Sequence, residues 1–304
     1  MVGLTNTRPA VRAGLWTLGA ILPWATMAAA IESALKSTSS SQLLFWSFLF
    51  AAPSAFLWDR LLGGRRPATA GLWMPPVVLA LGMLGIFGWT AGVILSLDRA
   101  PVIEANLLTY LWPLMMVGLA PLAGERFSSV ALAGAVVGFV GAGLVVTEGK
   151  GFSVDPAHHL GYALALAAAC AWAAFVILLR RRGEPGTRRT PGFVLAALCL
   201  ATLMALVLDG GISVPAWSTL AAAAWLGLGP MSLSFVCWDR AVATDHLGLV
   251  GRMSYLDPLI STLLLMAVLG LAPTAAAWIG MALIMLGIAV PELIEARHRK
   301  VAST

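Results

Sequence analysis

The chain has 304 residues, of which 60% are hydrophobic and 11% are charged, and its formal net charge at pH 7 is +5. Soluble domains carry about 25% charged residues, so this composition excludes a soluble globular protein. It also excludes a nucleic-acid partner, because binding a polynucleotide needs a water-exposed basic patch that so apolar a chain has no room to build.

Apolar runs long enough to cross a bilayer follow one another along the chain, each of about 20 residues. Backbone in lipid must satisfy its own hydrogen bonds, so these runs are predicted to be helices. Ten are expected, near residues 13–34, 41–62, 72–97, 101–122, 128–147, 160–180, 191–209, 216–240, 246–270 and 275–294. The first run ends in Ala28-Ala29-Ala30, as a signal peptide does, but Pro23 and Trp24 at its middle favour a retained helix.

The basic residues segregate between the two sides of this predicted membrane protein. If the N-terminus is cytoplasmic, fifteen Lys and Arg residues fall in inward-facing segments, and only Lys36, Arg99 and Lys150 fall in outward-facing ones. Basic loops stay in the cytoplasm. The pattern therefore predicts an even number of spans, with both termini cytoplasmic.

Cysteine and histidine give no sign of a metal centre. Cys170, Cys199 and Cys237 lie singly in apolar runs and are expected to be unpaired, packed side chains. The four histidines are scattered without the spacing of metal ligands. No metal and no cofactor is expected.

The second half of the chain repeats the first. Leu-Asp-Arg-Ala at 97–100 corresponds to Trp-Asp-Arg-Ala at 238–241, 141 residues later, and Tyr-Leu-Trp-Pro-Leu at 110–114 corresponds to Tyr-Leu-Asp-Pro-Leu at 255–259, 145 residues later. Trp-Ala at 24–25 returns at 172–173, after 148 residues. We expect two five-helix repeats, residues 1–150 and 151–304. Because five is odd, the second repeat is inverted in the membrane, which is typical of secondary transporters.

These features together resemble the drug/metabolite transporter superfamily, in its EamA-type branch. The resemblance rests on ten helices as five plus five, on Trp24 and Trp172 in the first helix of each half, and on the Tyr-Leu-x-Pro-Leu elements. The segment 106–114 is similar to that of the aromatic amino acid exporters in this superfamily. The resemblance implies export of amino acids from the bacterial cytoplasm across the inner membrane. It also implies a central cavity lined by helices 1–4 and 6–9, with helices 5 and 10 outside it.

Pro113 and Pro258 occupy equivalent places in helices 4 and 9, where they are expected to bend the helix. Each removes a backbone donor and clashes with the carbonyl four residues earlier, at Thr109 and Ser254. We interpret the matched bends as hinges, although a packing kink is the alternative.

Helix 4 carries the polar side chains that suit an amino acid best. Asn106, Tyr110 and Pro113 share one face, whereas Trp112 lies about 200° from Tyr110 on an ideal helix. Tyr110 and Trp112 can therefore meet one cavity only if the proline distorts the helix. The Asn106 amide can bind an amino or a carboxyl group, and an interhelical hydrogen bond is its alternative role.

The resemblance favours three tryptophans as substrate contacts, Trp89, Trp112 and Trp172. We add Trp24 and Tyr255, which are the repeat counterparts of Trp172 and Tyr110. Packing or contact with lipid is the alternative for each tryptophan. Glu32 and Glu104 lie close enough to the outer boundary to be solvated.

Asp257 stands in helix 9 at the place that Trp112 holds in helix 4. A charge inside the membrane is costly, and the two halves differ at this point. The carboxyl could bind a substrate's ammonium or carry a proton, or it could form a structural pair with Arg252 or with another helix.

The small-residue ladders, Gly134, Gly138 and Gly141 in helix 5 and Gly280 and Gly287 in helix 10, predict close helix packing.

The expected function is export of aromatic and other amino acids by alternating access, either coupled to protons or down the substrate gradient. Nothing resembles a nucleotide-binding loop. The alternative within transporters is export of drug-like cations or other small metabolites. A membrane-embedded enzyme is the remote alternative, because no nucleophile and base, or pair of carboxylates, is visible at membrane depth. The oligomeric state is left open.

Overall fold

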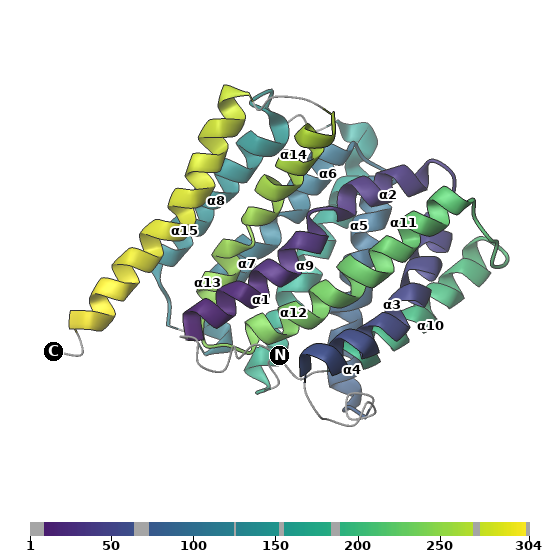
Figure 1. Ribbon diagram of the computed structural model, residues 1–304, viewed down its shortest axis with the longest axis horizontal. Helices are drawn as coiled ribbons and strands as arrows, with labels where there is room; N and C mark the ends of the chain where they lie inside the picture. Colours follow the sequence, from purple (N-terminus) through teal and green to yellow (C-terminus); the bar gives the residue numbers. More distant parts are fainter. Residues whose placement is uncertain are drawn as a thin grey trace.

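The computed structural model describes residues 9–63, 73–124, 126–151, 155–183, 189–269 and 274–301. Its described residues are helical or lie in turns and loops, and the helices form ten membrane spans (Figure 1). In the first repeat they are span 1 (α1 Pro9–Trp24 and α2 Met27–Leu35), span 2 (α3 Ser40–Gly63), span 3 (α4 Pro76–Gly82, the π-helix η3 Met83–Gly88 and α5 Trp89–Leu97), span 4 (α6 Val102–Thr109, α7 Leu111–Leu119 and the 3-10 helix η4 Ala120–Ala123) and span 5 (α8 Ser129–Thr147).

The second repeat has the same succession of spans. They are span 6 (the 3-10 helix η5 Pro156–His158 and α9 His159–Arg181), span 7 (α10 Thr190–Leu208), span 8 (α11 Trp217–Leu228, the π-helix η6 Gly229–Leu233 and α12 Ser234–Val242), span 9 (α13 Leu247–Met253 and α14 Leu256–Leu269) and span 10 (α15 Ala275–Val301). This confirms the predicted all-α membrane fold with two inverted five-helix repeats. The predicted edges at residues 72 and 270 lie outside the described residues.

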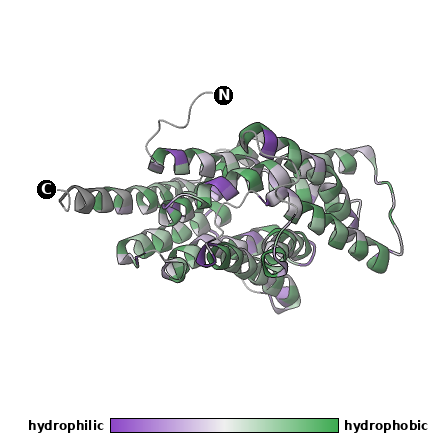
Figure 2. Cartoon of the chain, turned by 90° about the horizontal axis from the view of Figure 1, so that it is seen from below, coloured by the Kyte–Doolittle hydropathy of each residue, from purple (hydrophilic) through white to green (hydrophobic). Residues whose placement is uncertain are grey.

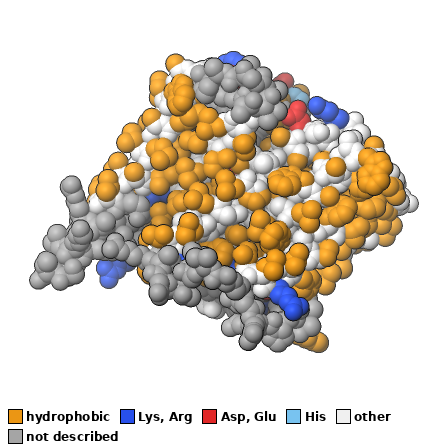
Figure 3. Space-filling view, in the orientation of Figure 1, with side chains coloured by type: hydrophobic (Ala, Val, Ile, Leu, Met, Phe, Trp, Pro, Cys, Tyr) orange, Lys and Arg blue, Asp and Glu red, His pale blue; other side chains and the backbone are white. Residues whose placement is uncertain are grey.

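Within the described residues, eight of these spans are long and apolar enough to cross a bilayer. In span 10 a shorter apolar helix, Ala275–Pro291, is found. The flank in Figure 3 is covered by hydrophobic side chains, and charged ones gather toward its two ends. Figure 2 shows the same apolar colouring along the helices from below. The molecule is therefore a multi-pass membrane protein.

We call one end of the bundle the arginine-rich end, where α9 and α12 finish. There Arg240 pairs with Asp59 of α3 at 3.0 Å and lies over the ring of Trp16, 5.5 Å from its centroid. Arg180 donates to the carbonyl oxygens of Val242 and Thr244 at 2.7 and 2.8 Å. These contacts tie spans 1, 2, 6 and 8 together at that end.

At the opposite end, which we call the far end, Asp209 joins span 7 to span 2. Its carboxylate accepts hydrogen bonds from Ser39, Ser41 and Gln42. The slight burial of Asp209 raises the pKa of its carboxyl, but these three hydrogen bonds outweigh burial and lower the pKa below its usual value.

Spans 5 and 10 lie side by side at one edge of the bundle, as α8 and α15 show in Figure 1. A Cβ on Gly141 would lie 2.6 Å from the Gly280 oxygen, and one on Gly134 would lie 2.5 Å from the Gly287 oxygen. Only glycine allows such backbone approach, so the predicted close packing is confirmed, and the two ladders meet each other.

The irregularities of the helices also repeat. Spans 3 and 8 each contain a π-helical segment, and spans 4 and 9 each break, at Tyr110 and at Ser254–Tyr255. Span 1 breaks after Pro23, whereas its counterpart α9 runs unbroken through Trp172 because it carries no proline there. Irregular backbone in a membrane is found where it lines an interior site.

Candidate functional site

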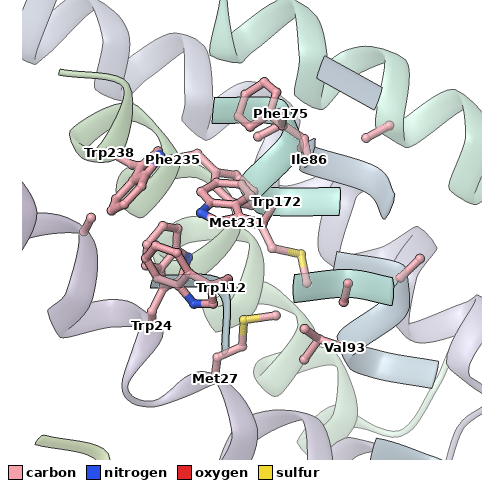
Figure 4. Close-up of a cluster of buried hydrophobic side chains, with 14 of the residues drawn as sticks. Trp24, Met27, Ile86, Val93, Trp112, Trp172, Phe175, Met231, Phe235 and Trp238 are labelled. Atoms are coloured by element: carbon pink, nitrogen blue, oxygen red, sulfur yellow. The ribbon is translucent and has the colours of Figure 1, made fainter. Parts of the chain in front are cut away.

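Five tryptophans from five different spans meet in the middle of the bundle. We call Trp24, Trp89, Trp112, Trp172 and Trp238 the tryptophan cluster. Neighbouring ring centroids lie 5.1 to 6.4 Å apart, mostly edge to face or tilted, the geometry that aromatic rings prefer. Phe235 stacks on Trp172 with centroids 5.5 Å apart. Figure 4 shows Trp24, Trp112, Trp172 and Trp238 converging from different helices.

One side of the tryptophan cluster borders a cavity that we call the central cavity. Its lining residues are Trp24, Met27, Ala28, Trp89, Val93, Asn106, Thr109, Tyr110, Trp112, Asp257 and Ser261. They come from spans 1, 3, 4 and 9, and none belongs to spans 5 or 10. The cavity measures about 30 Å³, room for one or two water molecules. In this conformation the spans close around the cavity, and a larger molecule fits only when they part.

The break in span 4 brings both of its aromatic residues to the central cavity. α6 ends at Thr109 and α7 begins at Leu111, with Tyr110 between them at φ −67° and ψ 2°. On an unbroken helix Tyr110 and Trp112 would diverge by about 200°. The break removes that conflict, and both side chains line the cavity.

Pro113 and Pro258 lie just after the breaks, in the first turns of α7 and α14. A proline there leaves the carbonyl oxygen four residues earlier without its helical partner. The hydroxyls beside these positions bond back along the preceding turn, Thr109 to the Asn106 oxygen at 2.7 Å and Ser254 to the Val250 oxygen at 2.8 Å. Both predicted bends are present as complete helix breaks.

The Asn106 amide lies close to the side chain of Tyr110, four residues further along the same span. Its Nδ2 atom donates to the Tyr110 hydroxyl over a long 3.4 Å. A bond of that length is weak and easily exchanged for a ligand. Among the described residues, the Asn106 amide makes no hydrogen bond to another span. The alternative role as an interhelical hydrogen bond is therefore not seen in this conformation.

Asp257 lies in the central cavity and makes no ion pair with any described residue. Its Oδ1 atom is buried and has no hydrogen-bond partner within the described part of the chain. Arg252 is only 1% exposed and packs elsewhere, with its Cδ near Gly134 of α8. The Arg252 ion pair considered from the sequence is therefore not formed, and Asp257 keeps an acceptor for a ligand.

Two of the expected site residues lie outside the central cavity. Trp172 belongs to the tryptophan cluster but faces a second cavity, described below. Tyr255, the repeat counterpart of Tyr110, is 1% exposed and packs against Gly138, where an added Cβ would lie 2.8 Å from the Tyr255 ring. Tyr255 therefore packs between spans 9 and 5, and we do not propose it as a substrate contact.

Trp238 and Phe235 were missed as site residues by the sequence reasoning. Both lie in α12 and are 2% exposed within the aromatic interior. Trp238 is the first residue of the repeated x-Asp-Arg-Ala element, which was the signal available. Nothing in the local pattern separates it from a lipid-facing tryptophan such as Trp225, which is 48% exposed.

The second cavity lies on the other side of the tryptophan cluster, toward the arginine-rich end, and we call it the arginine-end cavity. It is lined by Ile86, Trp172, Phe175, Val176, Leu179, Arg180, Thr190, Phe235, Trp238, Asp239 and Val242. The tryptophan cluster therefore lies between the two cavities, with Trp24, Trp89 and Trp112 lining one and Trp172 and Trp238 the other.

Within the described residues no group of three or more His, Cys, Asp or Glu side chains could hold a metal ion. The cysteines are unpaired, with Cys237 buried and Cys170 and Cys199 exposed.

Comparison with known proteins agrees with this architecture. The chain matches the EamA-like transporter family twice, over residues 11–147 and 159–291. It is 34% identical over 277 residues to the aromatic amino acid exporter YddG of Ancylobacter novellus, covering 84% of this chain and 96% of that protein. It is 26% identical over 295 residues to a probable terminal-alkyne amino-acid exporter of Streptantibioticus cattleyicolor, covering 93% and 94%. A solved crystal structure, 33% identical, superposes with a TM-score of 0.81 over 94% of this chain and 97% of that one.

Proposed function

The chain belongs to the EamA-like transporter family, and on that premise we propose that it exports aromatic amino acids from the cytoplasm by alternating access. It is a membrane transporter and not an enzyme. Both relatives reported above are named as amino-acid exporters, which supports an amino acid as the cargo.

The observation that carries the proposal is the central cavity bordered by the tryptophan cluster. Trp24, Trp89 and Trp112 supply flat, apolar faces at which an indole or phenyl ring can pack edge to face or offset. A threonine or another small polar side chain gains nothing comparable there. Selection for aromatic cargo follows from this difference.

The polar part of the same cavity suits the charged end of an amino acid. Asp257 offers an unpartnered carboxylate oxygen to an ammonium group, and charge-assisted hydrogen bonds of this kind are among the strong ones. The Asn106 amide and the Tyr110 hydroxyl offer donors to a carboxylate. An organic cation without a carboxylate would leave those two groups unused.

Movement of the cargo needs the spans to part on one side at a time. We place the hinges at the breaks before Pro113 and Pro258, where the backbone already lacks helical hydrogen bonds. The repeats, taken as residues 1–150 and 151–304, would exchange conformations as the cavity opens alternately to each side. The arginine-rich end faces the cytoplasm of a bacterial inner membrane, with both termini there, because basic residues gather on that side.

The deciding experiment is uptake into proteoliposomes containing the purified protein, with labelled tryptophan, threonine and an organic cation compared. Tryptophan uptake well above protein-free liposomes, with little uptake of the other two, is expected. Transport of the cation alone would refute the amino-acid proposal and favour the drug-like cargo. The same liposomes with an imposed pH gradient separate proton coupling from movement down the substrate gradient.

A further inference from the structure

The two cavities are related by the inverted repeat. Trp24, Met27 and Ala28 of span 1 line the central cavity. Their counterparts 148 residues later are Trp172, Phe175 and Val176 of span 6, and all three line the arginine-end cavity. Because the same positions of the two repeats shape both cavities, the arginine-end cavity is the pseudo-symmetric partner of the central one.

The walls of the arginine-end cavity carry charges of both signs. Arg180 has a side chain only 10% exposed, and the carbonyl oxygens of Val242 and Thr244 hold its guanidinium in place. Asp239 lines the same cavity from α12. A fixed cation and a carboxylate in one cavity match the carboxylate and the ammonium of a zwitterion.

Two of the tryptophans that line this cavity carry a buried donor without an acceptor. The Nε1 atoms of Trp172 and Trp238 make no hydrogen bond within the described part of the chain, although both rings are buried. Trp24, by contrast, donates its Nε1 hydrogen to the Pro230 oxygen at 3.0 Å. A buried N–H without an acceptor is costly, so these two donors beside the cavity point to an acceptor that they meet during the transport cycle.

The apolar part of the cavity suits an aromatic ring. Phe175 and Phe235 flank Trp172, with ring centroids 5.4 and 5.5 Å from it. The cavity has about 20 Å³ of free volume in this conformation, so an aromatic ring enters only when Phe175 and Phe235 move away from Trp172, after which it can take their place beside the indole.

We propose that the arginine-end cavity is a second binding site, which takes an aromatic amino acid from the cytoplasm before it passes the tryptophan cluster into the central cavity. Asp239 binds the ammonium, and Arg180 with the Nε1 donors of Trp172 and Trp238 binds the carboxylate. This inference rests on the proposed function, since it names where the same cargo binds first.

The test measures exchange of labelled tryptophan in inside-out and right-side-out membrane vesicles, which present the arginine-rich end and the far end respectively. Asp239→Asn is expected to raise the tryptophan concentration for half-saturation about tenfold at the arginine-rich end, from the loss of one charge-assisted hydrogen bond. At the far end the change is expected to stay below about twofold, and this retained exchange also shows that the variant folds. The matched control is Asp245→Asn, which removes the exposed partner of Arg180 outside the cavity lining and should change neither value.

Competitors that lack one charged group separate binding from general damage. Applied at the arginine-rich end, tryptamine has no carboxylate and indole-3-propionate has no ammonium. Asp239→Asn should weaken competition by tryptamine and spare indole-3-propionate. Trp238→Phe should do the reverse, because it keeps an aromatic ring but removes the five-membered ring that carries the N–H donor.

The results distinguish failure of the proposed function from failure of the second binding site alone. If the unaltered protein exchanges no tryptophan at either end, the proposed function fails and the second site with it. If the unaltered protein exchanges tryptophan but Asp239→Asn shifts both ends equally, or neither end, only the second site is overturned. Equal weakening of both competitors by each variant would likewise overturn it.

Discussion

Trp24 and Trp172 hold the same position in the two repeats, and their rings meet edge to face with centroids 5.5 Å apart. Each residue lines a different cavity, Trp24 the central one and Trp172 the arginine-end one. The pseudo-symmetry axis of the molecule therefore passes close to this contact. In the proposed transport cycle the two repeats exchange conformations about this contact, which would make the tryptophan cluster the barrier between the two sides of the membrane.

Asp257→Asn is expected to weaken tryptophan binding from both ends. The amide keeps the shape of the carboxyl but loses the negative charge that faces the ammonium, so half-saturation should rise about tenfold in counterflow. Glu32→Gln is the control, because Glu32 is exposed and lies outside the cavity. An unchanged half-saturation would remove Asp257 from the binding site. If export responds to a pH gradient, the same variant decides whether Asp257 carries the proton: an unchanged pH profile excludes it.

Pro113→Ala and Pro258→Ala are expected to slow transport more than they weaken binding. Alanine restores the backbone N–H, which can re-form the helical bond to the carbonyl of Thr109 or Ser254 and stiffen the break. The maximal rate should fall several-fold while half-saturation changes little. Pro53→Ala is a matched control, since Pro53 is an exposed proline within the unbroken helix α3. Maximal rates equal to that of the control would show that the breaks are packing kinks.

The break in span 4 shows what the sequence could and could not predict. The repeat, the prolines and the number of spans follow from composition and spacing, because hydrophobic runs and matched motifs are local signals. The conflict between Tyr110 and Trp112 was visible too, but its resolution by a complete break depends on how span 4 packs against the other spans. The π-helical segments of spans 3 and 8 have no local signature and were not expected.

Tyr255 marks the limit of reasoning from the repeat. Its sequence context is nearly that of Tyr110, yet its ring packs on Gly138, while Tyr110 lines the central cavity. The neighbours of a residue across the bundle decide such a difference, and a single sequence does not encode them locally. For the same reason, the sequence did not identify Trp238 as a member of the tryptophan cluster.

Gly141→Ala is expected to destabilise the protein, and Gly143→Ala in the same helix is its control. A Cβ at Gly141 would meet the backbone of Gly280 at 2.6 Å, so α8 and α15 would have to separate. The loss should be about 1–3 kcal/mol, seen as a lower midpoint of thermal unfolding in detergent. A Cβ at Gly143 meets only Leu107 at 3.8 Å, an ordinary contact, and its helix propensity should leave stability equal or slightly higher. Equal midpoints for the two variants would contradict the packing of spans 5 and 10.

Asp209 is expected to stabilise the far end in a way that depends on pH. Its pKa is lower in the folded protein than the usual 3.8, so the unfolded chain binds more protons at acid pH. The stabilisation is therefore full above about pH 5 and declines as the pH falls through the folded pKa. The difference in thermal midpoint between the unaltered protein and Asp209→Asn should be present at neutral pH and shrink below about pH 4. When Ser39 and Ser41 are both replaced by Ala, Asp209→Asn should lower the thermal midpoint by a smaller amount. An equally large decrease would show that the two hydroxyls do not contribute to the stability that Asp209 provides.

Counterflow of labelled tryptophan is the most direct test of alternating access for an aromatic amino acid. Proteoliposomes loaded with unlabelled tryptophan are diluted into a trace of labelled tryptophan, with protein-free liposomes and liposomes loaded with threonine as controls. A transient overshoot of label is expected with tryptophan inside, and none with threonine inside. An overshoot with threonine inside as large as that with tryptophan, or none with either, would contradict an aromatic amino acid exporter built around the tryptophan cluster.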